Sequence, residues 1–435
     1  MIKGILILVF MLLMISLIIS RKWPILAAIP VLTLGIAAIA GVPLMAPAGE
    51  TSIIITIISE GSSKLVLTFS AVLIAAWMSC IMQDTGISET MIRKAAELGG
   101  DKTNLVAVIL FVVVAALSTA MSGLGAVIMM GTIVIPVLIS VGVDKLTAAS
   151  ILLMAYGAGE HFGMLRATFF GDFLNLDPAT VYPMSLVVGS TTAAASLIYI
   201  GLRLRKNGKK YLFSVKAGEV DDILEDKPEI KGIKGGFAMM TPLVPIVLAV
   251  AFKWPVMPSF LAGIVWVLIF TYKGWKKMNN LMAKTCYDGF LMGAPSVILM
   301  IFLGMLLNAI NTPQVQEALT PIAASIMPHS VVVFVIMFIV IAPLCLYRGP
   351  LNSMGLGAGI ATLMASVGVL PPIIVCVGFL GVAGIQETSC PTNTYNIWVA
   401  DFVEEDVLTI TKKQLLWVWA GAACAIIIGT LMYWK

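Results

Sequence analysis

The chain has 435 residues, of which 60% are hydrophobic and only 11% are charged. Its mean hydropathy of +1.02 lies far outside the range of soluble domains and indicates a protein that crosses the membrane many times. The net charge of +4 comes from basic residues placed between apolar segments, which excludes a nucleic-acid-binding face. The six cysteines fall in or beside apolar segments with no CxxC spacing, which indicates neither a disulfide framework nor a zinc site.

The first half of the chain alternates apolar and polar segments. A helix needs about 20 apolar residues to span the hydrocarbon. The elements predicted by this rule are, in order, spans at 4–20, 25–46 and 65–83, an amphipathic stretch at 88–104, a hairpin at 105–143, an interrupted helix at 146–176 and a span at 181–202. The hairpin is expected to be re-entrant, because its tip, SGLGA at 122–126, has neither the length nor the charge of a loop between two full spans.

A mixed-charge segment at 203–236 is predicted to be a solvated linker that divides the chain into halves. The second half repeats the plan of the first. Its predicted elements are spans at 237–252 and 257–272, an amphipathic stretch at 273–285, a span at 286–310, a hairpin at 329–369, an interrupted helix at 371–400 and a span at 414–434. Pro350 and Pro391 each suit the first turn of a new helix inside these elements.

Short segments recur between the halves in the same order. SVGV at 140–143 recurs at 366–369, and Gly123 corresponds to Gly349, both at an offset of 226. Because five spans and one hairpin make an odd number of crossings, the second copy is expected to be inverted. With the N-terminus outside, most Lys and Arg residues fall on the inner side. We therefore expect a multi-pass protein of the bacterial cytoplasmic membrane with both termini external.

The predicted fold is thus all-α and membrane-integral, with two inverted repeats that each contain five transmembrane helices and one re-entrant hairpin. Few charged residues lie inside the predicted membrane segments, and each is expected to face the bundle interior or water. Arg348, at the second hairpin tip, is the residue we expect to hold a carboxylate, because a guanidinium donates strong hydrogen bonds to anions. A snorkelling arginine or an ion pair with Glu387 is the alternative. Arg166 is a further candidate, with Glu160 and Asp172 within reach as structural partners, and Asp172 and Asp401 are themselves candidates.

Glu160 and Glu387 occupy nearly equivalent places in the two halves and are the candidates for binding the coupling ion. Burial favours the uncharged form of a carboxyl group, which suits a proton carrier, whereas a neighbouring arginine favours the ionised form. The sequence does not decide whether these two carboxyl groups are protonated or ionised. His161 belongs to a residue type that titrates near physiological pH and is expected either to share the proton or to act as a hydrogen-bonding spacer.

The polar, proline-broken run at 383–401 is unusual in so apolar a chain. Non-helical backbone at membrane depth is tolerated only where protein or a water-filled cavity surrounds it, so this run predicts a substrate or ion site. Its hydroxyls and amides, with those of the two hairpin tips, suit substrate hydroxyls or a sodium ion. The substrate-site candidates besides Arg348 are Ser122, Gly123, Gly125, Gly349, Asn352, Thr388, Ser389, Thr392, Asn393 and Thr394.

Two Gly- and Ser-rich tips, each followed by a helix broken at GAGEHFG or QETSCPTNT, make the chain similar to the ion transporter superfamily of citrate-metal, gluconate and C4-dicarboxylate permeases. CPTNT at 390–394 resembles the proline-threonine-asparagine signature of the sodium-dicarboxylate branch. Neither tip carries the Ser-Asn-Thr signature of that branch, so proton coupling, as in the gluconate branch, stays open beside sodium coupling.

The resemblance implies a homodimeric elevator with a scaffold and a moving transport domain. The implied parts are scaffold at 1–83, an arm at 84–104, transport domain at 105–205, a cytoplasmic linker at 206–235, scaffold at 236–272, an arm at 273–285, scaffold at 286–311 and transport domain at 312–435.

The expected function is therefore symport of a small carboxylate, such as a hydroxy- or dicarboxylate, with protons or sodium. The expected partners are the anionic substrate, membrane lipid and a second copy of the chain. Besides a coupling proton or sodium ion we expect no metal and no cofactor. A cation/proton antiporter is the nearest alternative. A membrane enzyme is a weaker one, because HExxH and GxSxG patterns are absent.

Overall fold

The computed structural model describes residues 2–20, 22–47, 49–100, 102–207 and 232–434, and in these ranges it contains helices and turns without β-strands. The helices of the first half are α1 (Ile2–Ile19), α2 (Ile25–Ala40), the π-helical η1 (Ile53–Glu60), α3 (Val66–Asp84), α4 (Ile87–Gly99), α5 (Thr103–Ser118), α6 (Leu124–Ser140), α7 (Lys145–Phe162), α8 (Met164–Leu174) and α9 (Pro178–Asn207). Those of the second half are α11 (Gly232–Met239), α12 (Leu243–Ala251), α13 (Val256–Thr271), α14 (Trp275–Ile310), α15 (Pro313–Ile326), α16 (Val331–Ile341), the 3₁₀ helix η2 (Ala342–Arg348), α17 (Gly357–Val367), α18 (Pro372–Gly381), α19 (Ala383–Ser389), α20 (Thr394–Phe402) and α21 (Val407–Tyr433).

Six helical segments of the described chain are long and apolar enough to cross a membrane. The pair α11 and α12, bent by 56° at its break, makes a seventh if it counts as one span. Six further apolar helices are shorter, and the first four of them are α1, α2, α5 and α6. The predicted all-helical, multi-pass membrane architecture is confirmed at this level. The arrangement as two inverted repeats stays a prediction.

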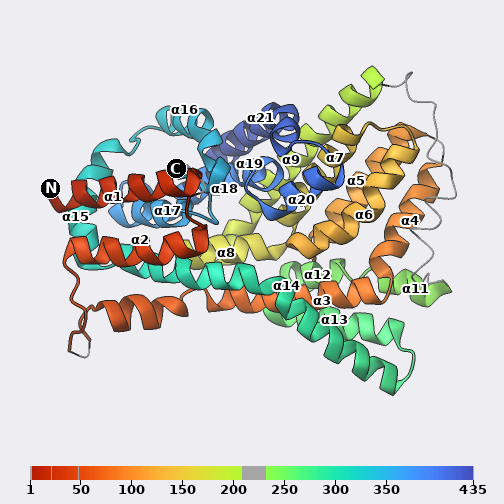
Figure 1. Ribbon diagram of the computed structural model, residues 1–435, viewed down its shortest axis with the longest axis horizontal. Coiled ribbons are helices and arrows are strands. Elements are labelled where there is room, and N and C mark those ends of the chain that lie inside the picture. The colour runs from red at the N-terminus through yellow and green to blue at the C-terminus, as the bar shows by residue number, and fades with distance from the viewer. Residues whose placement is uncertain (1, 21, 48, 101, 208–231, 435) are drawn as a thin grey trace.

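The helices α3 and α14 pack along each other, with α2, α4, α8 and α13 beside them. In Figure 1, α3 and α14 run side by side, and they make the most extensive contact between any two elements of the described chain. Gly289 of α14 permits this approach, because a Cβ there would lie 2.5 Å from the Cα of Trp77 in α3. An ion pair of 2.6 Å between Lys284 and Asp84 joins the same two helices.

Each half contains an unwound hairpin tip. In the first hairpin α5 ends at Ser118 and α6 begins at Leu124, so the chain is unwound at 119–123, slightly before the predicted tip. Gly123 has a φ of +86°, which side chains with a Cβ rarely adopt. In the second hairpin the chain unwinds at the end of η2, whose last two residues, Tyr347 and Arg348, have φ values of +56° and +60°. Two successive non-glycine residues in this region carry backbone strain, which concentrates at functional sites.

Each half also contains a broken helix, and the broken ends are capped from the helix that follows. At the first break, between α7 and α8, the carbonyl of His161 accepts from Ser185 and that of Phe162 accepts from Tyr182, both on α9. At the second break, after α19, Gln414 donates to the carbonyl of Thr388, and Thr411 donates to that of Ser389. The two pairs of capping residues, 182 with 411 and 185 with 414, are each 229 positions apart, close to the offset of the sequence repeat.

Several predicted boundaries are wrong. Pro350 and Pro391 do not open helices, because α17 begins at Gly357 and α20 begins at Thr394. After Pro391, Asn393 donates to the carbonyl of Gln386, a contact that holds the chain in a turn.

Elsewhere the amphipathic stretch at 273–285 and the span after it form one continuous helix, α14, since no glycine or proline separates them. The helix α15 was not predicted. Most of the predicted linker, 208–231, lies outside the described residues.

Candidate substrate and ion site

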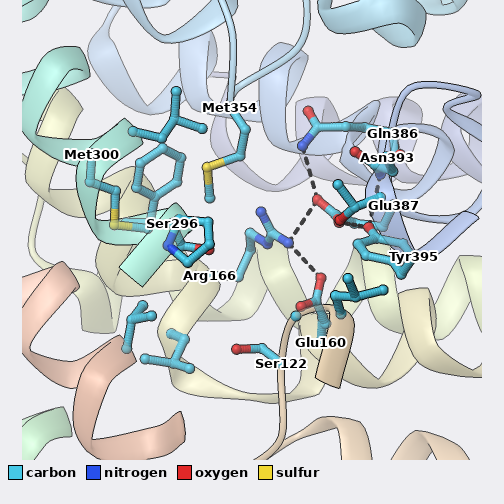
Figure 2. A pocket seen from close by; sticks show the side chains of 18 of the residues that line it. Ser122, Glu160, Arg166, Ser296, Met300, Met354, Gln386, Glu387, Asn393 and Tyr395 are labelled. Atoms are coloured by element: carbon cyan, nitrogen blue, oxygen red, sulfur yellow. Dashed lines mark hydrogen bonds and ion pairs between the residues drawn. The ribbon is translucent and has the colours of Figure 1, made fainter. Parts of the chain in front are cut away.

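A cavity of about 350 Å³ lies where both hairpin tips and both broken helices meet (Figure 2). The tips contribute Ser122 and Gly123 from the first hairpin, and Arg348 and Met354 from the second. The remaining walls come from α2, α3, α7, α8, α14, α19 and α20. Their lining side chains are Ile25, Leu26, Thr68, Val72, Tyr156, Glu160, Leu165, Arg166, Phe169, Met292, Pro295, Ser296, Leu299, Met300, Gln386, Glu387, Thr394 and Tyr395, together with Ser118, Thr119, Leu124 and Asn393 beside the breaks.

Glycines in the GAGEHFG segment of α7 let the two broken helices approach each other. A Cβ at Gly157 would lie 2.6 Å from Cγ2 of Thr388 on α19, and a Cβ at Gly159 would meet the Ala115 carbonyl of α5. The absence of both side chains allows α7 to sit directly against α5 and α19. Glu160, one residue beyond Gly159, is thereby placed near Glu387 although 227 positions separate the two in the chain.

Arg166 bridges the two carboxylates. Its Nη2 atom lies 2.6 Å from Oε2 of Glu160 and 2.7 Å from Oε1 of Glu387. All three side chains are buried, with exposed fractions of 8% for Arg166, 11% for Glu160 and 6% for Glu387. With both carboxylates ionised, this triad carries one net negative charge, so a single proton makes it neutral.

Each carboxylate is also bonded, through one intermediate side chain, to the backbone of a hairpin tip. The N–H of Gly123 donates to the hydroxyl of Tyr156 at 2.8 Å, and this hydroxyl donates to Glu160 at 2.7 Å. On the other side, the N–H of Ser353 donates to Oε1 of Gln386 at 2.9 Å, and Nε2 of Gln386 donates to Glu387 at 2.9 Å. Hydrogen bonds therefore link each hairpin tip to one of the two carboxylates whose protonation sets the charge of the triad.

A second tyrosine completes the arrangement around Glu387. The hydroxyl of Tyr395 donates to Oε2 of Glu387 and accepts from Nδ2 of Asn393. The rings of Tyr156 and Tyr395 pack with their centroids 5.0 Å apart. Between them the two tyrosines, Gln386 and Arg166 supply a hydrogen-bond donor to every carboxylate oxygen of Glu160 and Glu387, as buried charges require.

Arg348 lines the same cavity without an acidic partner among the described residues. Its one side-chain hydrogen bond is a long one, 3.4 Å from Nη1 to the carbonyl of Met354. The prediction that Arg348 pairs with Glu387 as a structural alternative is wrong, because Glu387 pairs with Arg166. Arg348 thus presents a guanidinium with unused donors to the cavity.

Of the candidates derived from the sequence, the structure brings one group together around the cavity. This group is Ser122, Gly123, Glu160, Arg166, Arg348, Glu387, Asn393 and Thr394. A second group lies beside the cavity and does not line it: Gly125, Gly349, Asn352, Thr388, Ser389 and Thr392. In this second group Asn352 shapes the second tip through bonds to the Cys345 carbonyl and the Met354 N–H.

The remaining candidates do not line the cavity. Asp172 accepts from the N–H and hydroxyl of Thr68 and is not a partner of Arg166. Asp401 is exposed at the end of α20. His161 is fully buried, its ring nitrogens have no hydrogen-bond partner among the described residues, and it does not line the cavity. No group of three or more His, Cys, Asp or Glu side chains in the described ranges is placed to hold a metal ion.

Tyr156, Tyr395 and Gln386 were missed in the sequence, as was the wall formed by α14. Tyr156 lies one helical turn before Glu160, the spacing at which side chains on one helix face meet, and this was the available signal. Gln386 and Tyr395 belong to the polar run at 383–401. Met292, Ser296 and Met300 recur at every fourth position of an ordinary apolar helix, so no pattern distinguishes them.

No family model matches the sequence, and no curated protein matches it either. Among solved structures it is similar to MtrF of Neisseria gonorrhoeae, described as illuminating a class of antimetabolite efflux pumps, with a TM-score of 0.65 and 13% identity over 93% of this chain and 94% of that one. It is also similar to the YdaH transporter of Alcanivorax borkumensis, with a TM-score of 0.61 and 12% identity over 99% and 98% of the two chains. The chain shares their fold. Membership of the ion transporter superfamily in particular stays a prediction.

Proposed function

We propose that this chain is a secondary active transporter that moves a small carboxylate anion together with protons. The observation that carries the proposal is the set of charged residues that line the cavity between the two hairpin tips and the two helix breaks. One arginine there, Arg348, has unused donors, and beside it two carboxylates share the guanidinium of Arg166. The fold shared with two transporters of known structure supports the general class.

The anion assignment rests on Arg348. A guanidinium with free donors in a partly buried cavity favours a carboxylate, which it can bind through two parallel hydrogen bonds. It disfavours a cation as the cargo, because both carboxylates of the cavity already pair with Arg166, whereas Arg348 has no acidic partner among the described residues. This charge arrangement is the reason to prefer the symporter over the cation/proton antiporter.

The proton assignment rests on the triad and on the second helix break. Glu160 and Glu387 compete for one guanidinium, so a proton that neutralises either carboxylate leaves a balanced ion pair. A sodium ion needs several free oxygens. At the break, the carbonyls that would supply them already accept from Asn393, Thr411 and Gln414.

The transport cycle is proposed to be of the elevator type in a homodimer, as the sequence resemblance implies. Under this proposal α3 and α14 belong to the scaffold, whereas the hairpin tips, α7, α8, α19 and α20 move together with the bound substrate. The protein would act in the bacterial cytoplasmic membrane with both termini external.

Uptake of labelled organic acids into proteoliposomes, under an imposed proton or sodium gradient, tests the proposal. We expect saturable uptake of at least one carboxylate, driven by an inward proton gradient and indifferent to sodium. Glu160→Gln and Glu387→Gln should each abolish the response to the proton gradient. Glu404→Gln, which breaks an exposed pair with Lys145, is the matched control and should retain it. Failure to move any organic acid, or cation-driven proton flux without one, would contradict the proposal.

A further inference from the structure

The charged residues that line the cavity limit how much charge a substrate can bring. Among its lining residues only Glu160, Glu387, Arg166 and Arg348 carry a formal charge at neutral pH, and with all four ionised their charges cancel. A substrate with one carboxylate brings one negative charge, which one proton on the triad offsets. A substrate with two carboxylates brings a second charge, for which the described lining residues offer no further cation.

The side of the cavity away from the triad is mainly apolar. α14 contributes Met292, Leu299 and Met300 with the one hydroxyl of Ser296, and Met354 of the second tip lies beside them. In Figure 2 the side chains of Met300 and Met354 lie on one side of Arg166, and Glu160 and Glu387 lie on the other. A substrate whose head binds the arginines therefore places its tail against thioether and aliphatic surface. Such surface favours an apolar tail and disfavours a charged one.

Arg166 has a buried nitrogen that the triad does not use. Its Nη1 atom has no hydrogen-bond partner among the described residues, whereas Nη2 serves both carboxylates. Figure 2 shows this unbonded guanidinium nitrogen on the side of Arg166 opposite to its bonds with Glu160 and Glu387. A buried donor without a partner is costly, and a substrate carboxylate bound between Arg166 and Arg348 would satisfy it.

We propose, on the basis of the carboxylate transport proposed above, that the site selects a monocarboxylate with an uncharged apolar body and carries it with one proton. The arginines hold the head group, the α14 wall holds the tail, and the triad takes the proton. The complete cycle is electroneutral, because one negative charge and one proton cross together.

Two 2-oxo acids of equal chain length test this selectivity. 2-Oxohexanoate and 2-oxohexanedioate differ only in a second carboxylate at the tail, and the strongly acidic 2-oxo carboxyl keeps both from crossing lipid unaided. With the purified full-length protein, calorimetry should show 2-oxohexanoate binding at least about tenfold tighter, the effect of roughly one unpaired charge. The monomethyl ester at the tail of 2-oxohexanedioate should recover the affinity. Equal or tighter binding of the dianion would overturn the inference.

Proteoliposomes test the electroneutral cycle. Uptake of 2-oxohexanoate should respond to a pH gradient and stay unchanged when a potassium gradient with valinomycin imposes a membrane potential of either sign. Uptake driven by the potential would overturn the proposed stoichiometry. Binding and uptake of the dianion alone would overturn this inference and leave the proposed carboxylate transport intact. Binding of neither acid would also overturn this inference, whereas the proposed carboxylate transport fails only if the wider panel of organic acids is not taken up either.

Met300→Lys tests the tail wall directly. A cation there should raise the affinity for 2-oxohexanedioate about tenfold relative to 2-oxohexanoate. Met300→Leu, the matched control, should keep the wild-type preference. An unchanged preference in a folded Met300→Lys protein would place the tail elsewhere and contradict the inference, and the comparison of the two acids on the wild-type protein stands even if this variant does not fold.

Discussion

Arg166 and Arg348 line the same cavity and are predicted to have separable roles. Arg166 pairs with two buried carboxylates, whereas Arg348 has only a long bond to a carbonyl. Removing one member of a buried ion pair typically costs about 3–5 kcal/mol, because it leaves an uncompensated charge. Arg166 is therefore expected to be required for stability as well as for binding, and Arg348 for binding alone.

We expect Arg166→Met to lower the stability of the detergent-solubilised protein by about 3–5 kcal/mol. Arg348→Met should retain nearly the wild-type stability. A thiol-reactive dye can follow thermal unfolding, since Cys345, Cys376 and Cys390 are buried in the fold. Equal melting temperatures for the two variants would show that the triad does not stabilise the site as described.

The bonds from the hairpin tips to the triad give a second prediction at the level of single residues. Tyr156→Phe keeps the ring that packs on Tyr395 and removes the hydroxyl that holds the N–H of Gly123. Gln386→Leu removes the acceptor of the Ser353 N–H. Each loss leaves a backbone donor unsatisfied, at a cost of about 1–3 kcal/mol.

Hydrogen exchange with mass spectrometry should therefore separate the two variants. Tyr156→Phe is expected to accelerate exchange at 119–124 and to leave 349–355 unchanged, and Gln386→Leu should show the reverse. Changes at both tips in both variants would mean that the tips respond to general loosening of the site and not to these particular bonds.

The charged residues of the site were predictable from the sequence. The ion pairs that they form were not. Glu160, Glu387, Arg166 and Arg348 stand out because charged residues are rare in apolar segments. Which arginine pairs with which carboxylate depends on the close approach of α7 and α19, which the sequence does not encode as a local pattern. Tyr156 was missed because a tyrosine in an apolar helix is more often an ordinary core residue.

At the scale of helices, close approach depends on glycine. Gly157 on α7 faces Thr388 on α19, and a Cβ there would lie 2.6 Å from Cγ2 of Thr388. Gly201 on α9 is the matched position, since a Cβ at this glycine meets nothing within 4 Å.

Gly157→Ala is therefore expected to push α7 away from α19 and to cost about 1–3 kcal/mol of stability through overpacking. Carboxylate uptake should fall at least tenfold, because Glu160 and Glu387 would no longer share Arg166. Gly201→Ala should be neutral or slightly stabilising, as expected for alanine in a helix. Full uptake by a stable Gly157→Ala protein would contradict the importance of this contact.

Helix boundaries were predictable where glycine or charge interrupts an apolar run and not where long-range contacts decide them. The breaks near Gly163 and at 390–393 follow from local sequence. The delayed starts of α17 and α20 follow turns in which the side chains of Asn352 and Asn393 bond backbone carbonyls seven positions earlier, a contact that no sequence pattern marked. The continuity of α14 depends on its packing along α3, and no local signal separates its amphipathic start from a surface arm.

At the scale of the whole molecule, the elevator proposal requires the scaffold and the transport domain to separate. One contact between the proposed domains is the bond from Thr68 of α3 to Asp172 of α8. The ion pair between Asp84 and Lys284 joins α3 to α14 within the proposed scaffold. Only the first contact would have to break during transport.

Crosslinking should distinguish these contacts. In a background with Cys286→Ser and Cys424→Ser, a bifunctional thiol reagent should abolish carboxylate uptake in the Thr68→Cys/Asp172→Cys protein and leave it intact in the Asp84→Cys/Lys284→Cys protein. Uptake that survives efficient crosslinking of the first pair would rule out relative movement of α3 and α8.

The two halves of the molecule show equivalent details beyond those visible in the sequence. Tyr182 and Ser185 cap the first break as Thr411 and Gln414 cap the second. The offset of these capping pairs, 229 positions, is close to the 226 of the sequence repeat, although the capping roles themselves became visible only in three dimensions. This agreement supports the view that a single carboxylate site is built from both halves.

Carboxylate binding to the Arg348→Gln protein tests this view most directly. A charge-assisted hydrogen bond is worth about 1.5–3 kcal/mol, so calorimetry should show the dissociation constant of the transported acid rising about 10- to 100-fold. Arg203→Gln, which removes an arginine stacked on Tyr199 far along α9, should bind as the wild type does. Wild-type affinity in a folded Arg348→Gln protein would contradict the account.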